Sequence, residues 1–168
     1  HQGFSVSPTI GVLSTHPPTR CGLATFSSAL SEGLRATGAT VNTVRIADGS
    51  TTSDPGVVGE LTNGSPSSVA AAADLLNGCD LALVQHEYGI YGGADGEEVV
   101  DILKALRVPS IVVLHTVLKD PTDHQRWVLE MVAAQADHVV VMSAAAESRL
   151  SAGYDVDHRK VSMIPHGA

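Results

Sequence analysis

The chain has 168 residues, a net charge of −8 with neutral histidines, and only 4% aromatic residues. This length suits one domain, whose core must be packed mainly by aliphatic side chains. The small number of lysines and arginines argues against nucleic-acid binding through a basic surface, and no apolar run of about 18 residues predicts a membrane span.

Strand and helix patterns alternate along the first half of the chain. The predicted elements are a strand over residues 9–14, a helix from Gly22 to Gly38, a strand over 41–46, a short edge strand over 57–61 and a helix from Pro66 to Gly78. In the first helix, Leu23, Phe26 and Leu30 recur at helical spacing. The second helix has a capping residue, Ser65, directly before its first-turn proline.

The same alternation continues in the second half. Strands are predicted over residues 81–85, 110–114, 138–142 and 160–164, with helices after the glycine-rich loop 89–96, after Asp120 and after Ser143. Asp120 is expected to cap a helix that begins at Pro121, with Trp127, Val128, Met131 and Val132 facing inward. Ser143 is expected to cap the last helix, which ends at Gly153.

This βαβ alternation predicts an α/β fold, a doubly wound and mostly parallel Rossmann-like sheet of about six or seven strands. With the strands numbered in chain order and the edge strand left out, the expected order is 2-1-3-4-5-6. Its switch point lies between strands one and three. Open sheets of this kind bind ligands outside the carboxyl ends of their strands.

Histidines follow four of the apolar runs. They are His16, His86, His115 and His166. Because the carboxyl ends of parallel strands meet at one edge of the sheet, we expect these side chains to gather there. The sequence therefore predicts a polar site along that edge.

The loop from Thr15 to Gly22 joins the first strand to the first helix. Gly22 opens the helix, where backbone N–H groups favour an anion and the missing side chain permits close approach. Arg20 is able to pair with a phosphate, and Cys21 lies where a thiol pKa is often lowered. The alternative is an ordinary tight turn, since neither a dinucleotide fingerprint nor a P-loop is present.

Polar residues also follow the third and fourth strands. Gln85, His86, Glu87 and Tyr88 offer hydrogen bonds for several hydroxyls and a ring for a sugar face, although they also suit a structural network. His115 is suited to orienting a substrate near neutral pH, with a structural histidine as the alternative.

Several other classes of site are disfavoured. The histidines lack the spacing of a zinc site, and no G-x-S-x-G elbow marks a serine hydrolase. Cys21 and Cys79 fall at opposite ends of the predicted strands, so no disulfide is expected between them. No signal peptide is visible, and the expected location is cytoplasmic.

Four segments together resemble the retaining glycosyltransferases of family 4, which have the GT-B fold. They are residues 17–26, 85–93, 113–118 and 164–167. The stretch Gln-His-Glu-Tyr-Gly-Ile-Tyr-Gly-Gly at 85–93 is the most specific. The resemblance implies that residues 1–168 are the N-terminal, acceptor-side domain, and that the C-terminal domain, which binds the nucleotide sugar, is absent from this chain.

The resemblance also implies roles for individual residues. It makes His115 catalytic, Gly22 and Ser143 donor-binding, and His16, Arg20, His86, Glu87 and Tyr88 acceptor-binding. The family commonly has two adjacent glycines in the first loop, and Cys21 stands at the first of these positions.

The implied reaction moves a hexose, mannose or glucose, from a nucleotide sugar to a carbohydrate or glycolipid acceptor, with retention and with no metal or other cofactor. No nucleic-acid partner is expected. The isolated chain should be inactive, and a full-length form could be peripheral to a membrane. Alternative hypotheses are a stand-alone carbohydrate-binding or regulatory module and a flavodoxin-like ligand binder.

Overall fold

The computed structural model describes residues 7–165, so the predicted site residue His166 lies outside it. The strands are β1 (Thr9–Ser14), β2 (Thr40–Ile46), β3 (Val57–Leu61), β4 (Leu81–His86), β5 (Ser110–Leu114), β6 (His138–Val141) and β7 (Val161–Met163). The α-helices are α1 (Gly22–Ala36), α2 (Pro66–Asn77), α3 (Glu98–Ala105), α4 (Asp123–Gln135) and α5 (Ala144–Gly153). Short 3-10 turns lie at Tyr88–Ile90, Ala94–Gly96 and His158–Lys160.

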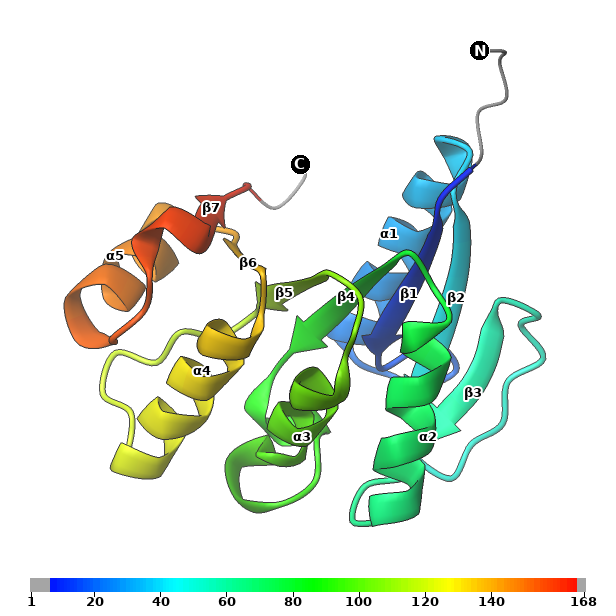
Figure 1. The fold of residues 1–168 in the computed structure, drawn as a ribbon, viewed down its shortest axis with the longest axis horizontal. Coiled ribbons are helices and arrows are strands. Elements are labelled where there is room, and N and C mark those ends of the chain that lie inside the picture. Colours follow the sequence, from blue (N-terminus) through cyan, green and yellow to red (C-terminus); the bar gives the residue numbers. More distant parts are fainter. Residues whose placement is uncertain (1–6, 166–168) are drawn as a thin grey trace.

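All seven strands form one parallel sheet in the order β3-β2-β1-β4-β5-β6-β7. This confirms the predicted order, with the short edge strand β3 added beside β2. In Figure 1, α2, α3 and α4 lie in front of the sheet and α1 lies behind it. The order reverses between β1 and β4, so the loops after these two strands flank the predicted switch point.

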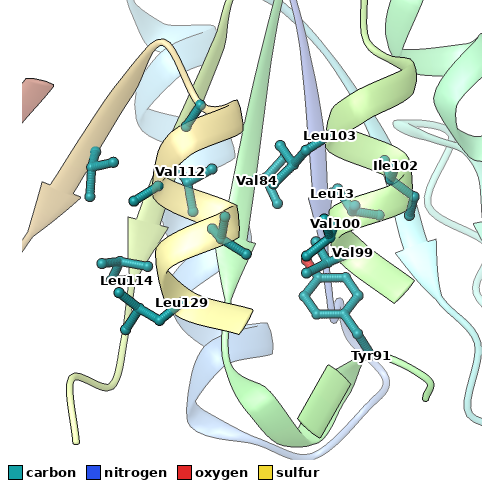
Figure 2. Close-up of a cluster of buried hydrophobic side chains, with 14 of the residues drawn as sticks. Leu13, Val84, Tyr91, Val99, Val100, Ile102, Leu103, Val112, Leu114 and Leu129 are labelled. Atoms are coloured by element: carbon teal, nitrogen blue, oxygen red, sulfur yellow. The ribbon is translucent and has the colours of Figure 1, made fainter. Parts of the chain in front are cut away.

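The main core lies between the sheet and the helices α2 to α4. Figure 2 shows Leu13 and Val84 of the strands near α3, which carries Ile102 and Leu103, and Val112 of β5 beside α4. These five side chains are all buried. Strands whose residues are buried this densely form a rigid frame for the loops at their ends.

Helix α2 begins and ends as predicted. Ser65 is its N-cap and accepts a hydrogen bond from the backbone N–H of Ser68, Pro66 is its first residue, and Gly78 is the C-cap. The predicted cap of α4 at Asp120 is wrong, and the helix begins at Asp123. Thr122 caps it instead, because its side chain and that of Gln125 form a reciprocal capping box.

The prediction that Trp127 faces inward is also wrong, because 45% of this residue is exposed. Val128 and Val132 are buried as predicted, and the buried stripe is completed by Leu129 and Ala133. Trp127 stands one residue outside that stripe, and its ring stacks on His124 with centroids 5.5 Å apart. Neighbouring positions on a helix point about 100° apart, so a shift of one residue moves a side chain off the buried face.

Cys21 and Cys79 are free thiols, as predicted from their positions at opposite ends of the strands. Across residues 7–165 no helix combines the length and the apolar character needed to cross a membrane.

Candidate functional site

The carboxyl edge of the sheet gathers the predicted polar residues. His16 follows β1, His86 ends β4, His115 follows β5 and Ser143 follows β6. Because every strand pair is parallel, these residues lie along one edge, and their predicted common placement is confirmed. Their roles in binding or catalysis stay predictions.

His115 lies where α1, β4 and β5 meet. Its Nε2 is 2.6 Å from Oε1 of Gln85, an amide oxygen that only accepts hydrogen bonds, so Nε2 carries a proton. Phe26 of α1 makes an edge contact with the imidazole, with ring centroids 5.1 Å apart. Gln85 is fully buried, and it therefore holds the half-buried ring of His115 in one orientation.

The sequence groups Gln85, at the end of the third predicted strand, with His86, Glu87 and Tyr88 as possible ligand contacts, but it does not predict the pairing of Gln85 with His115. Its signal is an amide at the end of a buried apolar run. Its Nε2 group is buried and has no hydrogen-bond partner among the described residues. Burying an amide costs free energy unless its atoms make hydrogen bonds. Here the hydrogen bond between Oε1 of Gln85 and His115 offsets part of that cost.

The loop after β4 is joined by further hydrogen bonds to the loop after β5 and to helix α4. The Thr116 hydroxyl donates to Oε1 of Glu87 at 2.8 Å, and the Tyr88 hydroxyl donates to the carbonyl of Gln125 at 3.3 Å. Burial raises the pKa of Tyr88 above its usual range, so the phenol remains a neutral donor. Glu87 and Tyr88 are both half-buried at the predicted site.

His86 lies beneath this surface. The residue is completely buried, between Tyr88 and Tyr91, and neither ring nitrogen has a hydrogen-bond partner in the described part of the chain. The predicted direct contact with an acceptor is therefore not available to this side chain. Burial, and secondarily the nearby His115, lower the pKa of His86 to about 4.

The pKa of His86 predicts that the domain loses stability in mild acid. Unfolded chains protonate histidine below about pH 6.5, whereas the folded protein resists protonation of His86 down to about pH 4. The unfolded state therefore binds more protons in this window, and the free energy of unfolding should fall by about 2 kcal/mol between pH 7 and 5. Urea unfolding of the wild type and of His86→Phe at both pH values measures this. An equally steep fall in His86→Phe would contradict the assignment.

Gly22 is the first residue of α1 and is exposed. The N–H groups of a helix's first turn have no partner within the helix, and Gly22 presents one of them at the edge of the sheet. A Cβ added at this position would meet nothing within 4 Å. Packing therefore does not require the glycine, and the space in front of it is open to a ligand.

Three further residues near this edge of the sheet are exposed. Cys21 is the N-cap of α1, and its Sγ accepts a hydrogen bond from the backbone of Ala24 at 3.3 Å. Arg20 is exposed and makes no ion pair within residues 7–165. Ser143 caps α5 through a 3.0 Å hydrogen bond from Ala146, as predicted, and is also exposed.

His16 is 3% exposed, and its Nε2 lies 2.8 Å from Oδ2 of Asp54. This pairing was not predicted, because Asp54 lies in the irregular segment between β2 and β3. The imidazole of His16 therefore lies beneath the surface, and the polar group that is exposed there is the carboxylate of Asp54.

Arg45 of β2 is the largest fully buried side chain, and its guanidinium joins the loops around the site. It donates to the carbonyls of His16 and Ser50, to the hydroxyl of Thr19 and to the carboxylates of Asp48 and Glu60. One side chain thus fixes the β1–α1 loop, the segment after β2 and strand β3 together. In the part of the chain that the structure describes, no three metal-ligating side chains are grouped to hold an ion.

The parallel Rossmann-like sheet is the fold expected of one domain of a GT-B glycosyltransferase. The family described as Glycosyltransferase Family 4 matches residues 21–168. The chain therefore belongs to glycosyltransferase family 4 and corresponds to its N-terminal domain. No match is found among curated protein sequences.

Solved structures with the same fold are also glycosyltransferases. A Rickettsia africae glycosyltransferase has a TM-score of 0.66 at 14% identity, over 96% of this chain and 44% of its own. Sucrose-phosphate synthase from Thermosynechococcus elongatus has a TM-score of 0.63 at 17% identity, and the match covers 95% of this chain and 90% of its own. An α-glucosyltransferase in complex with UDP and a 13-mer DNA has a TM-score of 0.56 at 19% identity, and the match covers 80% of this chain and 37% of its own. The chain thus spans less than half of the first and third proteins.

Proposed function

We propose that this chain is the acceptor-side domain of a retaining glycosyltransferase that transfers a hexose from a nucleotide sugar to a carbohydrate or glycolipid. The observation that carries the proposal is the position of His115. Gln85 orients its imidazole, and Phe26 places it against the first turns of α1, which begins at Gly22. A sugar and its phosphate, bound at this corner, would meet both groups.

The proposed roles follow from exposure and chemistry. The Gly22 N–H would point toward the diphosphate of the donor, and His115 would orient the hexose and stabilise charge that develops at the anomeric centre. Ser143 would border the donor from the loop after β6. The acceptor would contact Arg20, Glu87 and Tyr88, whereas His16 would act through Asp54 and His86 would support Tyr88 from below.

The second domain is part of the proposal. The α-glucosyltransferase of the same fold was solved with UDP, and this chain spans 37% of it. We infer that a further domain supplies most of the nucleotide-sugar contacts, so that the reacting groups meet in a cleft between the two. The hexose, mannose or glucose, and the retention of configuration follow from family resemblance.

A transfer assay with isotope-labelled nucleotide sugars tests this proposal. Residues 1–168 alone should show no turnover, whereas the two-domain enzyme should transfer label to a carbohydrate or glycolipid acceptor with or without EDTA. Robust turnover by the isolated chain would overturn the half-site arrangement. Absence of transfer by the two-domain enzyme across the donor panel would overturn the function.

Gly22→Ala should separate ligand contact from folding. The added methyl group meets open space in the protein, so the free energy of unfolding should stay the same or rise by up to about 1 kcal/mol. In the two-domain enzyme the same methyl should block the donor phosphate and lower kcat/KM about tenfold.

Gly33→Ala provides the matched control, since Gly33 lies on the same helix and its added Cβ also meets nothing within 4 Å. It should leave kcat/KM unchanged. Equal activity of the two variants would remove Gly22 from the proposed donor site.

A further inference from the structure

The loop between β4 and α3 is attached to the first turn of α4 at both of its ends. At its start, the Tyr88 hydroxyl donates to the carbonyl of Gln125. At its end, His124 pairs with two carboxylates: its Nδ1 lies 2.8 Å from Oδ2 of Asp95, and its Nε2 lies 3.0 Å from Oε2 of Glu97. Helix α4 lies beside α3 in Figure 1, so a single turn of α4 reaches both ends of the loop.

The two contacts of His124 define its charge. An ionised carboxylate only accepts hydrogen bonds, so both ring nitrogens of His124 must donate, and the ring is an imidazolium. The hydrogen bond with Asp95, followed by that with Glu97, raises the pKa of His124 above its usual value. Both contacts are therefore complete below about pH 6.5, and they are lost as the pH rises through the raised pKa, because one ring nitrogen then turns a lone pair toward a carboxylate.

The other ionisable groups nearby do not remove this charge at neutral pH. Tyr88 stays a neutral phenol, because burial and also Asp95 raise its pKa. His86 beside Tyr88 stays neutral as well, because burial lowers its pKa to about 4. The remaining groups are Asp123 on α4 and, across a hollow that Trp127 borders, Glu98, Asp101 and Lys104 of α3. Since carboxylates outnumber amines among them, the surroundings favour the charged ring.

The end of the loop has a backbone conformation that needs support. Gly93 and Gly96 have φ angles of 79° and 72°, and Asp95 between them has a φ of 53°, which is uncommon for a residue with a side chain. Gly96 packs so closely on the start of the loop that an added Cβ would lie 2.5 Å from the carbonyl oxygen of Tyr88. A movement of residues 95–97 away from α4 would therefore also move Tyr88.

We propose that His124 is a positioning residue, whose imidazolium holds residues 95–97 against α4 and thereby fixes Tyr88 where the acceptor is proposed to bind. The attachment is sensitive to pH and loosens in mildly alkaline solution. The importance of Tyr88 as an acceptor contact rests on the proposed transferase function, whereas the attachment of the loop does not. Neither the predicted site residues nor the family resemblance gives His124 a role.

A fluorescence titration of the 168-residue chain measures the charge of His124. Trp127 is the only tryptophan of the chain, and its ring stacks on His124 with centroids 5.5 Å apart. Because imidazolium quenches indole emission more strongly than neutral imidazole does, the emission should rise between pH 6 and 9, with a midpoint above about 6.5. Asp95→Asn should lower the proton affinity of His124 about threefold. Emission that does not titrate, or an unchanged midpoint in Asp95→Asn, would overturn the proposal.

Amide exchange of the ¹⁵N-labelled chain shows whether the loop follows this proton. The amides of Gly96 and Glu97 donate to carbonyls within the loop. At pH 8.5 they should exchange with water about fivefold faster than at pH 6.5, after correction for the intrinsic rate. The amide signal of Tyr88 should shift with the same midpoint as the emission. Protection that is equal at the two pH values would contradict the proposed attachment.

Two substitutions of His124 separate its charge from its volume. Arginine keeps several donors and a charge at every pH, so His124→Arg should retain the protection of Gly96 and Glu97 at pH 8.5. Glutamine is neutral, so His124→Gln should lack this protection even at pH 6.5. His158→Gln changes an exposed histidine of another 3-10 turn and should behave as the wild type. Equal protection in the arginine and glutamine variants would overturn the proposal, and the rest of the amide spectrum shows whether each variant is folded.

These measurements use no donor, no acceptor and no second domain. A failed transfer assay would therefore leave the attachment of the loop intact, and a failed titration would leave the transferase function intact.

Discussion

Replacing His115 by alanine is expected to lower kcat/KM of the two-domain enzyme about 100-fold, which corresponds to roughly 3 kcal/mol of transition-state stabilisation. The imidazole is held in one orientation by Gln85 and by the edge of Phe26, so it needs no reorganisation when charge develops on the sugar. Alanine removes that group, and water in its place is not oriented by either neighbour.

The measurement is the initial rate of label transfer at low donor concentration. The matched control is His138→Ala, which removes a half-buried histidine at the amino end of β6, where Nε2 pairs with Ser162. The control should stay within about twofold of the wild type. If His115→Ala stays within about threefold, a change under ~1 kcal/mol, the role assigned to His115 is wrong.

Gln85 should act on the reaction through His115. Its replacement by leucine removes the acceptor for the Nε2–H and so weakens the hold on the orientation of the ring. We expect kcat to fall about tenfold with little change in KM, because the hexose and acceptor contacts remain. An unchanged kcat would leave Gln85 with a structural role alone.

The elements that the sequence predicts well are those whose signals are local. Strands β4 and β5 each contain a continuous apolar run of four residues, and a strand buried on both faces needs no other information. Helix α2 carries its own start and stop in Ser65 and Gly78. The common edge of the histidines follows from parallel strand direction, which the βαβ alternation imposes.

The start of α4 shows where local signals compete. Asp120-Pro121 and Thr122 are both acceptable beginnings of a helix, and the reciprocal hydrogen bonds with Gln125 favour the second. Because a helix repeats every 3.6 residues, its inward face depends on which residues pack on the sheet. This is why Val128 and Val132 were predicted correctly and Trp127 was not.

The parts of the site that the sequence does not reveal depend on distant partners. Asp54 meets His16 across 38 positions, and Gln85 meets His115 across 30. Each of these polar residues taken alone is consistent with a solvated loop or a strand end. Only the packed sheet shows which of them is buried and against which neighbour.

Arg45 is the strongest case, because an arginine in a strand next to the sheet edge is expected to face water, and yet it is fully buried. Replacing it by methionine is expected to lower the free energy of unfolding by about 3 kcal/mol. Methionine fills much of the volume but donates no hydrogen bond, so the carbonyls of His16 and Ser50 lose their donor. Asp48 and Glu60 would also lose their shared cation.

Urea unfolding of Arg45→Met, Arg45→Lys and Arg159→Met measures this cost. Lysine keeps the charge but lacks the planar guanidinium group that reaches three segments at once. It should therefore recover less than half of the lost free energy of unfolding. Arg159 is the control because its side chain is 92% exposed and its pair with Asp157 is on the surface, which predicts a change within about 0.5 kcal/mol. An Arg45→Met protein within about 1 kcal/mol of the wild type would show that the loops at this edge are fixed by other contacts.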